Sequence, residues 1–293
     1  MVRFFNAFSP SFRSLLKHLS ILIAAFAVVA GAGVPGVSAA PRAELWPRWQ
    51  AHDPASTQVI NHREWTRLLQ TYGAKGEDGI VRIDYDRFSD GDKQALKGYI
   101  ERLASAAVSL LNRDEQLAYW INLYNALTID LVLAHYPVSS ILKINISPGL
   151  FSIGPWDKKL TAVEGEGLSL NDIEHRILRP IWRDPRIHYA VSCASLGCPN
   201  LALETYTAEN VERLLEANAF THVNHPRGVR IENGELIVSS IYRWYVADFG
   251  GGNAGVLKHL RQYARGELAE KLARNNFIGD DEYDWSINDL NPQ

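Results

Sequence analysis

The feature that most constrains the fold is a long helical segment that is apolar around almost its whole circumference. Residues 116–133 read Gln-Leu-Ala-Tyr-Trp-Ile-Asn-Leu-Tyr-Asn-Ala-Leu-Thr-Ile-Asp-Leu-Val-Leu, and Tyr136-Pro137 marks where the helix stops. Asn112 can cap its start, with Glu115 three residues later as in a capping box. Because a helix that is apolar all round must be covered on every side, we predict that it is the buried centre of the fold.

The remaining segments predict short elements around this helix. Asn233-Gly234 between two apolar runs is a strong hairpin signal, because a two-residue turn needs residues that tolerate positive φ. The predicted helices are His62–Tyr72, Asp92–Leu110, Ser169–Leu178 (ended by Pro180), Thr207–Phe220, Ser240–Asp248 and Ala254–Tyr263, and the predicted strands are Ile80–Tyr85, Leu160–Val163, Ile187–Val191, Val229–Ile231 and Leu236–Val238. This order predicts a single α+β domain, with a central buried helix and surrounding helices packed on a small mixed sheet.

The first 39 residues have the features of a secretory signal peptide. Basic residues and no acidic ones precede the apolar run Leu19–Val34, and the small residues Val37-Ser38-Ala39 follow it. Glycines and a proline interrupt the run, which argues against the alternative of a retained membrane anchor. We therefore expect residues 1–39 to be cleaved and the rest to be exported to the periplasm without a membrane span.

The mature chain is expected to consist of an irregular N-terminal arm, residues 40–61, and a globular domain, residues 62–293. Loss of the leader removes three basic and no acidic residues, so the formal net charge moves from −3 to −6. Nucleic-acid binding needs a basic face, so this class of protein is excluded. The partner that remains is a small-molecule or peptide ligand.

Both cysteines lie in one turn-rich loop that follows Ile187–Val191. In an exported protein, Cys193 and Cys198 can form a disulfide that staples the loop. Alternatively, Cys193 is a nucleophilic thiol and Cys198 a neighbour or resolving partner. The Cys-x4-Cys spacing has no second ligand pair, so we expect no metal site, and no cofactor is predicted.

Three polar residues near this loop are candidate partners of the thiol. His175 is the preferred base and Glu174 its orienting carboxylate, although neighbours on a helix point about 100° apart and a surface histidine is the simpler interpretation. His188 would lie on the opposite face of the predicted strand from Cys193, so a hydrogen-bonded core histidine is favoured there.

Two amides and one indole complete the candidate binding residues. Asn122 and Asn125 interrupt the apolar central helix, and a buried amide without a partner costs about 1–3 kcal/mol. Each must therefore either tie down a neighbouring loop or orient a ligand in a cleft. Trp156, in a loop rich in glycine, proline and aromatic residues, is the third candidate.

Several of these motifs together resemble one family, the uncharacterised family called domain of unknown function 547. They are residues 113–127 of the central helix, Gly154-Pro-Trp, residues 168–178, residues 188–201 and Ser240-Ile-Tyr-Arg-Trp-Tyr, with a family core at about residues 110–225. The resemblance implies that the central helix, the Glu174-His175 helix and the cysteine loop form one module, with Glu174, His175, His188 and Cys193 at family-pattern positions. It does not imply a particular reaction.

The leading hypothesis from the sequence is a thiol-dependent hydrolase or acyl transferase that acts on peptide-like amides. Cys193 would attack the carbonyl, His175 would accept the thiol proton, and Glu174 or Asn125 would orient the imidazole. Backbone amides of residues 193–197 would hold the oxyanion. The alternative is a non-catalytic periplasmic binding or interaction module in which Cys193 and Cys198 form a disulfide staple; a redox or metal role is the third possibility.

We predict that the mature protein begins at Ala40 or within a few residues of it, because signal peptidase reads the small residues before this position. Amino-terminal sequencing of the exported protein tests this. A membrane-bound product that still carries Leu19–Val34 would show instead that the segment is an anchor.

Overall fold

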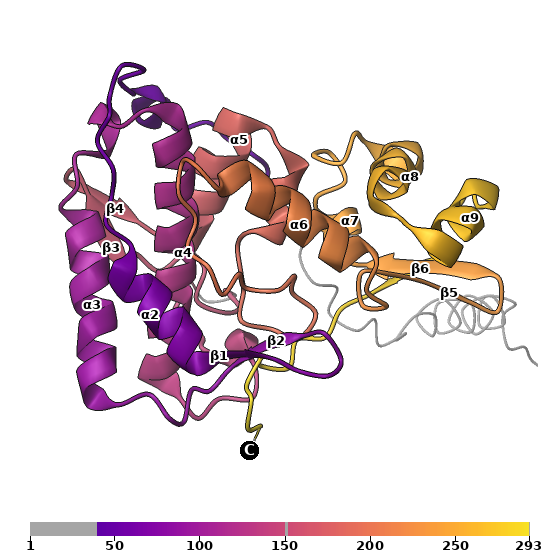
Figure 1. Cartoon of the computed structure of the whole chain (residues 1–293), viewed down its shortest axis with the longest axis horizontal. Coiled ribbons are helices and arrows are strands. Elements are labelled where there is room, and N and C mark those ends of the chain that lie inside the picture. The colour runs from indigo at the N-terminus through magenta and orange to yellow at the C-terminus, as the bar shows by residue number, and fades with distance from the viewer. Residues whose placement is uncertain (1–39, 150–151, 293) are drawn as a thin grey trace, which may run out of the picture. The chain divides into compact units, whose positions relative to one another are not determined.

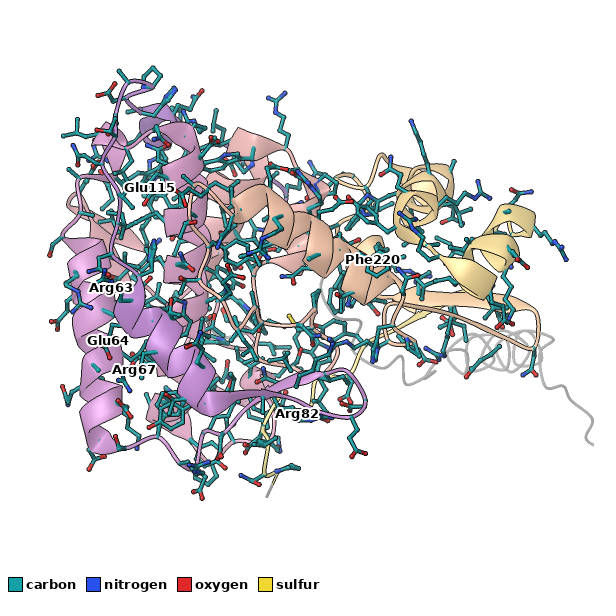
Figure 2. The ribbon with its side chains drawn as sticks, viewed as in Figure 1. Arg63, Glu64, Arg67, Arg82, Glu115 and Phe220 are labelled. Atoms are coloured by element: carbon teal, nitrogen blue, oxygen red, sulfur yellow. The ribbon has the colours of Figure 1, made fainter. Side chains whose placement is uncertain are left out.

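The central helix is α4, Arg113–His135, and it is buried along almost its whole length, as predicted. The Asn112 side chain accepts a hydrogen bond from the Glu115 amide at 2.9 Å and so caps the helix. The Glu115 carboxylate, at the N-terminal end of α4 (Figure 2), accepts the Ile60 amide at 2.7 Å instead of closing the capping box. By length and composition α4 could also cross a membrane, but its burial inside the protein is that of a core helix.

The computed structural model describes residues 40–149 and 152–292 of the chain. The predicted signal peptide lies outside these residues. The segment before α2 (Arg63–Tyr72) contains the short 3-10 helix η1, Pro47–Gln50. Its Trp49 is buried and packs edge-to-face on Trp120 of α4, with ring centroids 5.1 Å apart.

Helices surround α4 and bury its sides. Figure 1 shows α3 alongside α4, and α3, α6 and the π-helical segment η4 all contact α4. The described helices beyond α4 and η1 are α2 Arg63–Tyr72, α3 Asp90–Ala104, η2 Val108–Leu110, η3 Ile141–Lys143, η4 Asp172–Leu178, α5 Arg179–Trp182, η5 Pro185–Tyr189, α6 Val211–Val223, α7 Ile241–Trp244, α8 Gly252–Tyr263 and α9 Gly266–Arg274.

The strands are short and form three small sheets instead of one. Two are antiparallel pairs, β1 (Gly73–Lys75) with β2 (Val81–Ile83) and β3 (Thr161–Val163) with β4 (Glu166–Leu168). The third is mixed: β5 (Val229–Glu232) pairs antiparallel with β6 (Glu235–Ser239), which pairs parallel with β7 (Asp280–Glu282). The predicted α+β class is confirmed, and so is the hairpin, whose turn residues Asn233 and Gly234 have φ of 51° and 86°.

Two hydrophobic clusters hold these elements together. The larger is built around α4 and receives α2, α3, η4 and the start of α6. The smaller is built on β5 and β6 and is covered by α7, α8 and α9. The cysteine loop contributes to the larger cluster through Ala194, and Tyr189 just before it belongs to the smaller one.

The predicted strand Ile187–Val191 is wrong, because this run begins inside the 3-10 helix η5 and continues as a turn. Asp184 caps the helix by accepting the Arg186 amide at 2.8 Å, and Pro185 at the first helical position has the φ that a helix requires. A short apolar run fits a buried strand and a buried helical turn equally well, so its length does not separate them.

Several helix boundaries also differ from prediction; α6 begins at Val211 instead of Thr207, and α7 ends at Trp244 instead of Asp248. The helix predicted to stop before Pro180 continues through α5, because Pro180 lies in the first turn of that new segment, where no amide hydrogen is needed. The helix predicted to reach Leu110 ends at Ala104, and a separate 3-10 turn follows.

We predict that Asn122→Ala lowers the free energy of unfolding by about 1–3 kcal/mol, because it leaves two buried backbone groups without a hydrogen-bond partner. The Asn122 amide donates to the Tyr206 carbonyl at 2.7 Å and accepts the Tyr206 amide at 3.2 Å. Urea denaturation measures the change, and Asn253→Ala, at an exposed position of α8, is the matched control. A variant that unfolds like the wild type but loses a ligand would show that Asn122 lines a site instead.

Candidate functional site

The start of the cysteine loop, residues 192–198, is hydrogen-bonded to the central helix through one side chain. Asn125 of α4 donates to the Ala190 carbonyl at 2.9 Å and accepts the Ser192 amide at 2.8 Å. Both hydrogen bonds are buried, so the amide satisfies two backbone groups that water cannot reach. Asn125 therefore sets the position from which the loop starts.

The far side of the loop pairs with the C-terminal segment, residues 283–292, which Figure 1 shows returning from β7 towards β2. The Leu196 amide donates to the Ser286 carbonyl and the Gly197 amide to the Asp284 carbonyl, both at 2.8 Å. A side chain at position 197 would meet the Asp284 backbone nitrogen at 2.7 Å, so only glycine allows this approach.

Both cysteines are free thiols in the described part of the chain. The Cys193 sulfur lies 3.1 Å from the Ser195 hydroxyl and 3.0 Å from the Tyr283 hydroxyl. The Cys193 amide donates to the Cys198 sulfur at 3.2 Å. Cys193 is half-buried whereas Cys198 is buried, so the first thiol is the more accessible of the two.

These contacts separate the acidities of the two thiols. Hydrogen bonding from the Cys198 thiol, helped by the Ser195 and Tyr283 hydroxyls and opposed by burial, lowers the pKa of Cys193 to about 7. The pKa of Cys198 rises well above its usual value, because its proton is shared with Cys193 and because the group is buried. Burial also raises the pKa of Tyr283, so its hydroxyl stays protonated and can donate.

The histidines predicted to serve the thiol lie in a separate buried network. Arg179 Nη1 lies 2.9 Å from His175 Nδ1. A guanidinium can only donate, so this nitrogen is the acceptor. Burial, opposed by Glu174, lowers the pKa of His175 to about 4, so the ring is neutral at pH 7 with its other nitrogen protonated. The His175 ring therefore has no free lone pair with which to accept a thiol proton.

His188 and Glu174 complete this network. His188 is buried, with Nε2 at 2.7 Å from an Asp248 oxygen and Nδ1 at 3.5 Å from a Glu174 oxygen. Burial alone would raise the pKa of Glu174, but His175, His188 and Arg179 lower it to about 2. The predicted site residues Glu174, His175 and His188 are thus brought together, but no hydrogen bond joins either imidazole to the Cys193 sulfur among residues 40–149 and 152–292.

The loop amides predicted to bind an oxyanion are already engaged. Besides the Leu196 and Gly197 amides, the Ala194 amide donates to the Ser192 hydroxyl at 3.3 Å. The Ser195 amide hydrogen-bonds to the Cys193 sulfur and helps to lower the pKa of that thiol. The loop amides therefore stabilise the loop and its sulfur.

Trp156 lies two aromatic rings away from the thiol. Its ring centroid is 5.9 Å from that of Trp285, which is 4.6 Å from that of Tyr283. Tyr283 and Trp285 were not predicted from the sequence, because they lie about ninety positions after Cys193 and carry no local motif. The one signal in the sequence is the density of aromatic residues in Tyr283-Asp-Trp285.

One comparison with known proteins gives a match. The family model described as Protein of unknown function, DUF547, matches residues 108–223, a range that contains α4, η4, the cysteine loop and α6. No curated protein and no solved structure matches the chain. The matched range ends before Tyr283, so one hydroxyl on the Cys193 sulfur comes from outside it.

We predict that alkylation of Cys193 by iodoacetamide follows pH with a midpoint near 7, the pKa to which its hydrogen bonds bring the thiol. Tyr283→Phe removes a donor to the thiolate, so the midpoint should move to higher pH. Mass spectrometry of the modified peptide measures the rate. The control is Tyr263→Phe, whose hydroxyl contacts Glu216. A midpoint near that of free cysteine in the wild type would contradict the geometry.

Proposed function

The chain belongs, over residues 108–223, to the family described as Protein of unknown function, DUF547, and on the chemistry of its thiol site we propose that it catalyses thiol–disulfide exchange. The observation that carries the proposal is the asymmetric pair of thiols. Cys193 is half-buried and has a lowered pKa, and the buried Cys198 beside it has a raised pKa. This division suits an attacking thiol and a resolving thiol.

The exchange proceeds in two steps. The Cys193 thiolate attacks one sulfur of a substrate disulfide, forms a mixed disulfide and releases the other substrate sulfur as a thiolate. The thiolate released in the first step accepts the proton of Cys198, which then attacks the Cys193 sulfur, closes the internal disulfide and releases the second thiolate. The substrate gains two electrons, the two cysteines lose them, and an external dithiol returns the pair to the reduced state.

Ser195 and Tyr283 act on the first step. Their hydroxyls hydrogen-bond to the Cys193 sulfur and favour its charged form. Arg227 acts on the second: it donates to the Leu196 carbonyl at 2.7 Å, inside the loop, and its charge favours the thiolate of Cys198. Exchange thus uses two hydroxyls that contact the Cys193 sulfur and a guanidinium whose charge acts on Cys198.

Acyl transfer, the leading hypothesis from the sequence, places further demands on the same nucleophile. It needs a base for the thiol proton and donors for the oxyanion. The acceptor nitrogen of His175 is occupied by Arg179, and the loop amides have partners. Disulfide exchange needs no oxyanion donors, because its leaving group is another thiolate.

The disulfide staple of a non-catalytic module is the other alternative. The loop is already held by Asn125 on one side and by the C-terminal segment on the other. A Cys193–Cys198 bond would close a very short loop, and the entropy that a disulfide removes from the unfolded chain falls with loop length. A staple would therefore add little stability here. Export, as expected from the leader, would place the pair where disulfides form and persist.

The test is a reaction of the fully reduced protein with a chromogenic aromatic disulfide at pH 7. We expect the wild type to release two thiolates and end with an internal disulfide. Cys198→Ser should release one and remain as a mixed disulfide, and Cys193→Ser should react at least about tenfold more slowly, because its remaining thiol is buried and protonated. Thiol counting and mass spectrometry identify each product.

Three outcomes would overturn the proposal. Equal rates for the wild type and Cys193→Ser would remove Cys193 as the nucleophile. A Cys193–Cys198 disulfide that resists excess reductant in the native protein would identify a staple. A stable mixed disulfide in the wild type, together with cleavage of a thioester by Cys198→Ser at the wild-type rate, would favour acyl transfer.

A further inference from the structure

Four half-buried aromatic rings lie side by side next to the thiol. They are Trp156, Trp244, Tyr283 and Trp285, here called the aromatic platform. Neighbouring ring centroids are 5.9 Å (Trp156–Trp285), 5.4 Å (Trp244–Trp285), 4.8 Å (Trp244–Tyr283) and 4.6 Å (Tyr283–Trp285) apart. The Tyr283 hydroxyl at 3.0 Å from the Cys193 sulfur places the platform directly beside the reactive group.

Packing accounts for the buried side of the platform. Trp156 and Trp285 pack on the larger hydrophobic cluster, and Trp244 and Tyr283 pack on the smaller one. All four rings keep an intermediate exposure to solvent. Aromatic rings gathered at a surface beside a reactive thiol offer a contact area for a partner.

The electrostatic surroundings of the platform favour a cationic partner. Asp157 follows Trp156, and Asp284 stands between Tyr283 and Trp285; both are exposed and form no ion pair in the described residues. Two cations oppose these carboxylates in the described residues: the exposed Lys158, and the half-buried Arg227, whose charge acts on Tyr283. Lys159 and Arg243 are paired with Asp172 and Asp281. Of the exposed charges beside the platform, two carboxylates therefore stand against one lysine, in keeping with the net charge of the whole chain, −3.

The cation–π contacts of the described residues use aromatic rings outside the platform. Other aromatic rings of this protein carry a guanidinium over their face, such as Arg176 over Trp46 at 4.4 Å and Arg179 over Tyr245 at 4.8 Å. No such contact covers a platform ring in the part of the chain described. An arginine or lysine from a partner would meet no cation of the described residues over these rings, and a carboxylate lies close by.

We infer that the aromatic platform binds a lysine- or arginine-bearing segment of the polypeptide whose disulfide is exchanged at Cys193. The inference rests on the proposed function and names its substrate class: basic proteins or peptides that carry a cystine. Cation–π contacts with the indoles and attraction to Asp157 and Asp284 would hold the segment, so that its sulfur reaches Cys193.

Binding is tested without any exchange in the Cys193→Ser/Cys198→Ser double variant. Isothermal titration with an extended synthetic peptide of alternating lysine and glycine should show binding that weakens with salt, and the glutamate–glycine counterpart should not bind. Adding Trp285→Phe or Asp284→Asn should weaken binding about three- to tenfold, and urea denaturation should show that both variants are still folded under the conditions of the titration. The matched controls are Trp182→Phe and Asp90→Asn, away from the platform.

The inference would be overturned if the two peptides bound equally or if neither bound. It would also be overturned if neither platform substitution weakened binding. In the active wild type, a cystine flanked by lysines should react about tenfold faster than one flanked by glutamates, and Asp284→Asn should narrow that ratio. The small chromogenic disulfide needs no platform. Its failure to react would therefore count against the proposed function alone, and the titration would still decide on the platform.

Discussion

The burial of α4 along almost its whole length is the constraint on which the rest of this structure depends. A buried helix leaves no water for its polar side chains, so each must find a partner in the protein. Asn122 binds both backbone groups of Tyr206, Asn125 binds the backbone on either side of Val191, and Glu115 binds the arm at Ile60. The few polar residues of the core helix thereby fix the positions of irregular segments that belong to no helix or sheet.

The same constraint separates two polar sites that the sequence suggested were one. Asn125 holds the start of the cysteine loop, whereas Tyr124, the preceding residue of α4, donates to Glu174 at 3.2 Å. Neighbouring residues on a helix point about 100° apart, so one helix presents two different surroundings. The thiols therefore lie among hydroxyls, and the histidines lie among carboxylates and Arg179.

The histidine network has a structural task of its own. Arg179 of α5 and His188 of η5 both contact Asp248, which follows α7, at 2.6 and 2.7 Å. These contacts join the η4–η5 region to the segment that leads into the smaller hydrophobic cluster. Removing one member of the network would leave a buried charge without its partner, and an unpaired buried charge strongly destabilises the folded state. This explains why titratable groups gather here without contacting the thiol.

The sequence by itself determined the elements whose signals are local. The apolar circumference of residues 116–133 required a buried helix, Asn112 marked its start, and Asn233-Gly234 required a two-residue turn with positive φ. Each of these depends on side chains within a few positions of one another, so neighbouring residues are enough to define them. The choice of Cys193 as the candidate nucleophile, with Cys198 as its neighbour in the same loop, also came from one local motif, and the function of the two thiols stays a proposal.

Only the tertiary structure decided what surrounds that pair. Residues 187–191 were compatible with a strand or a helical turn, and the Asp184 cap with Pro185 selected the turn. Tyr283 reaches the Cys193 sulfur across ninety positions, and Arg179 rather than a thiol takes the acceptor nitrogen of His175. Such contacts depend on how distant segments pack around α4, and no periodicity or spacing within a segment encodes them.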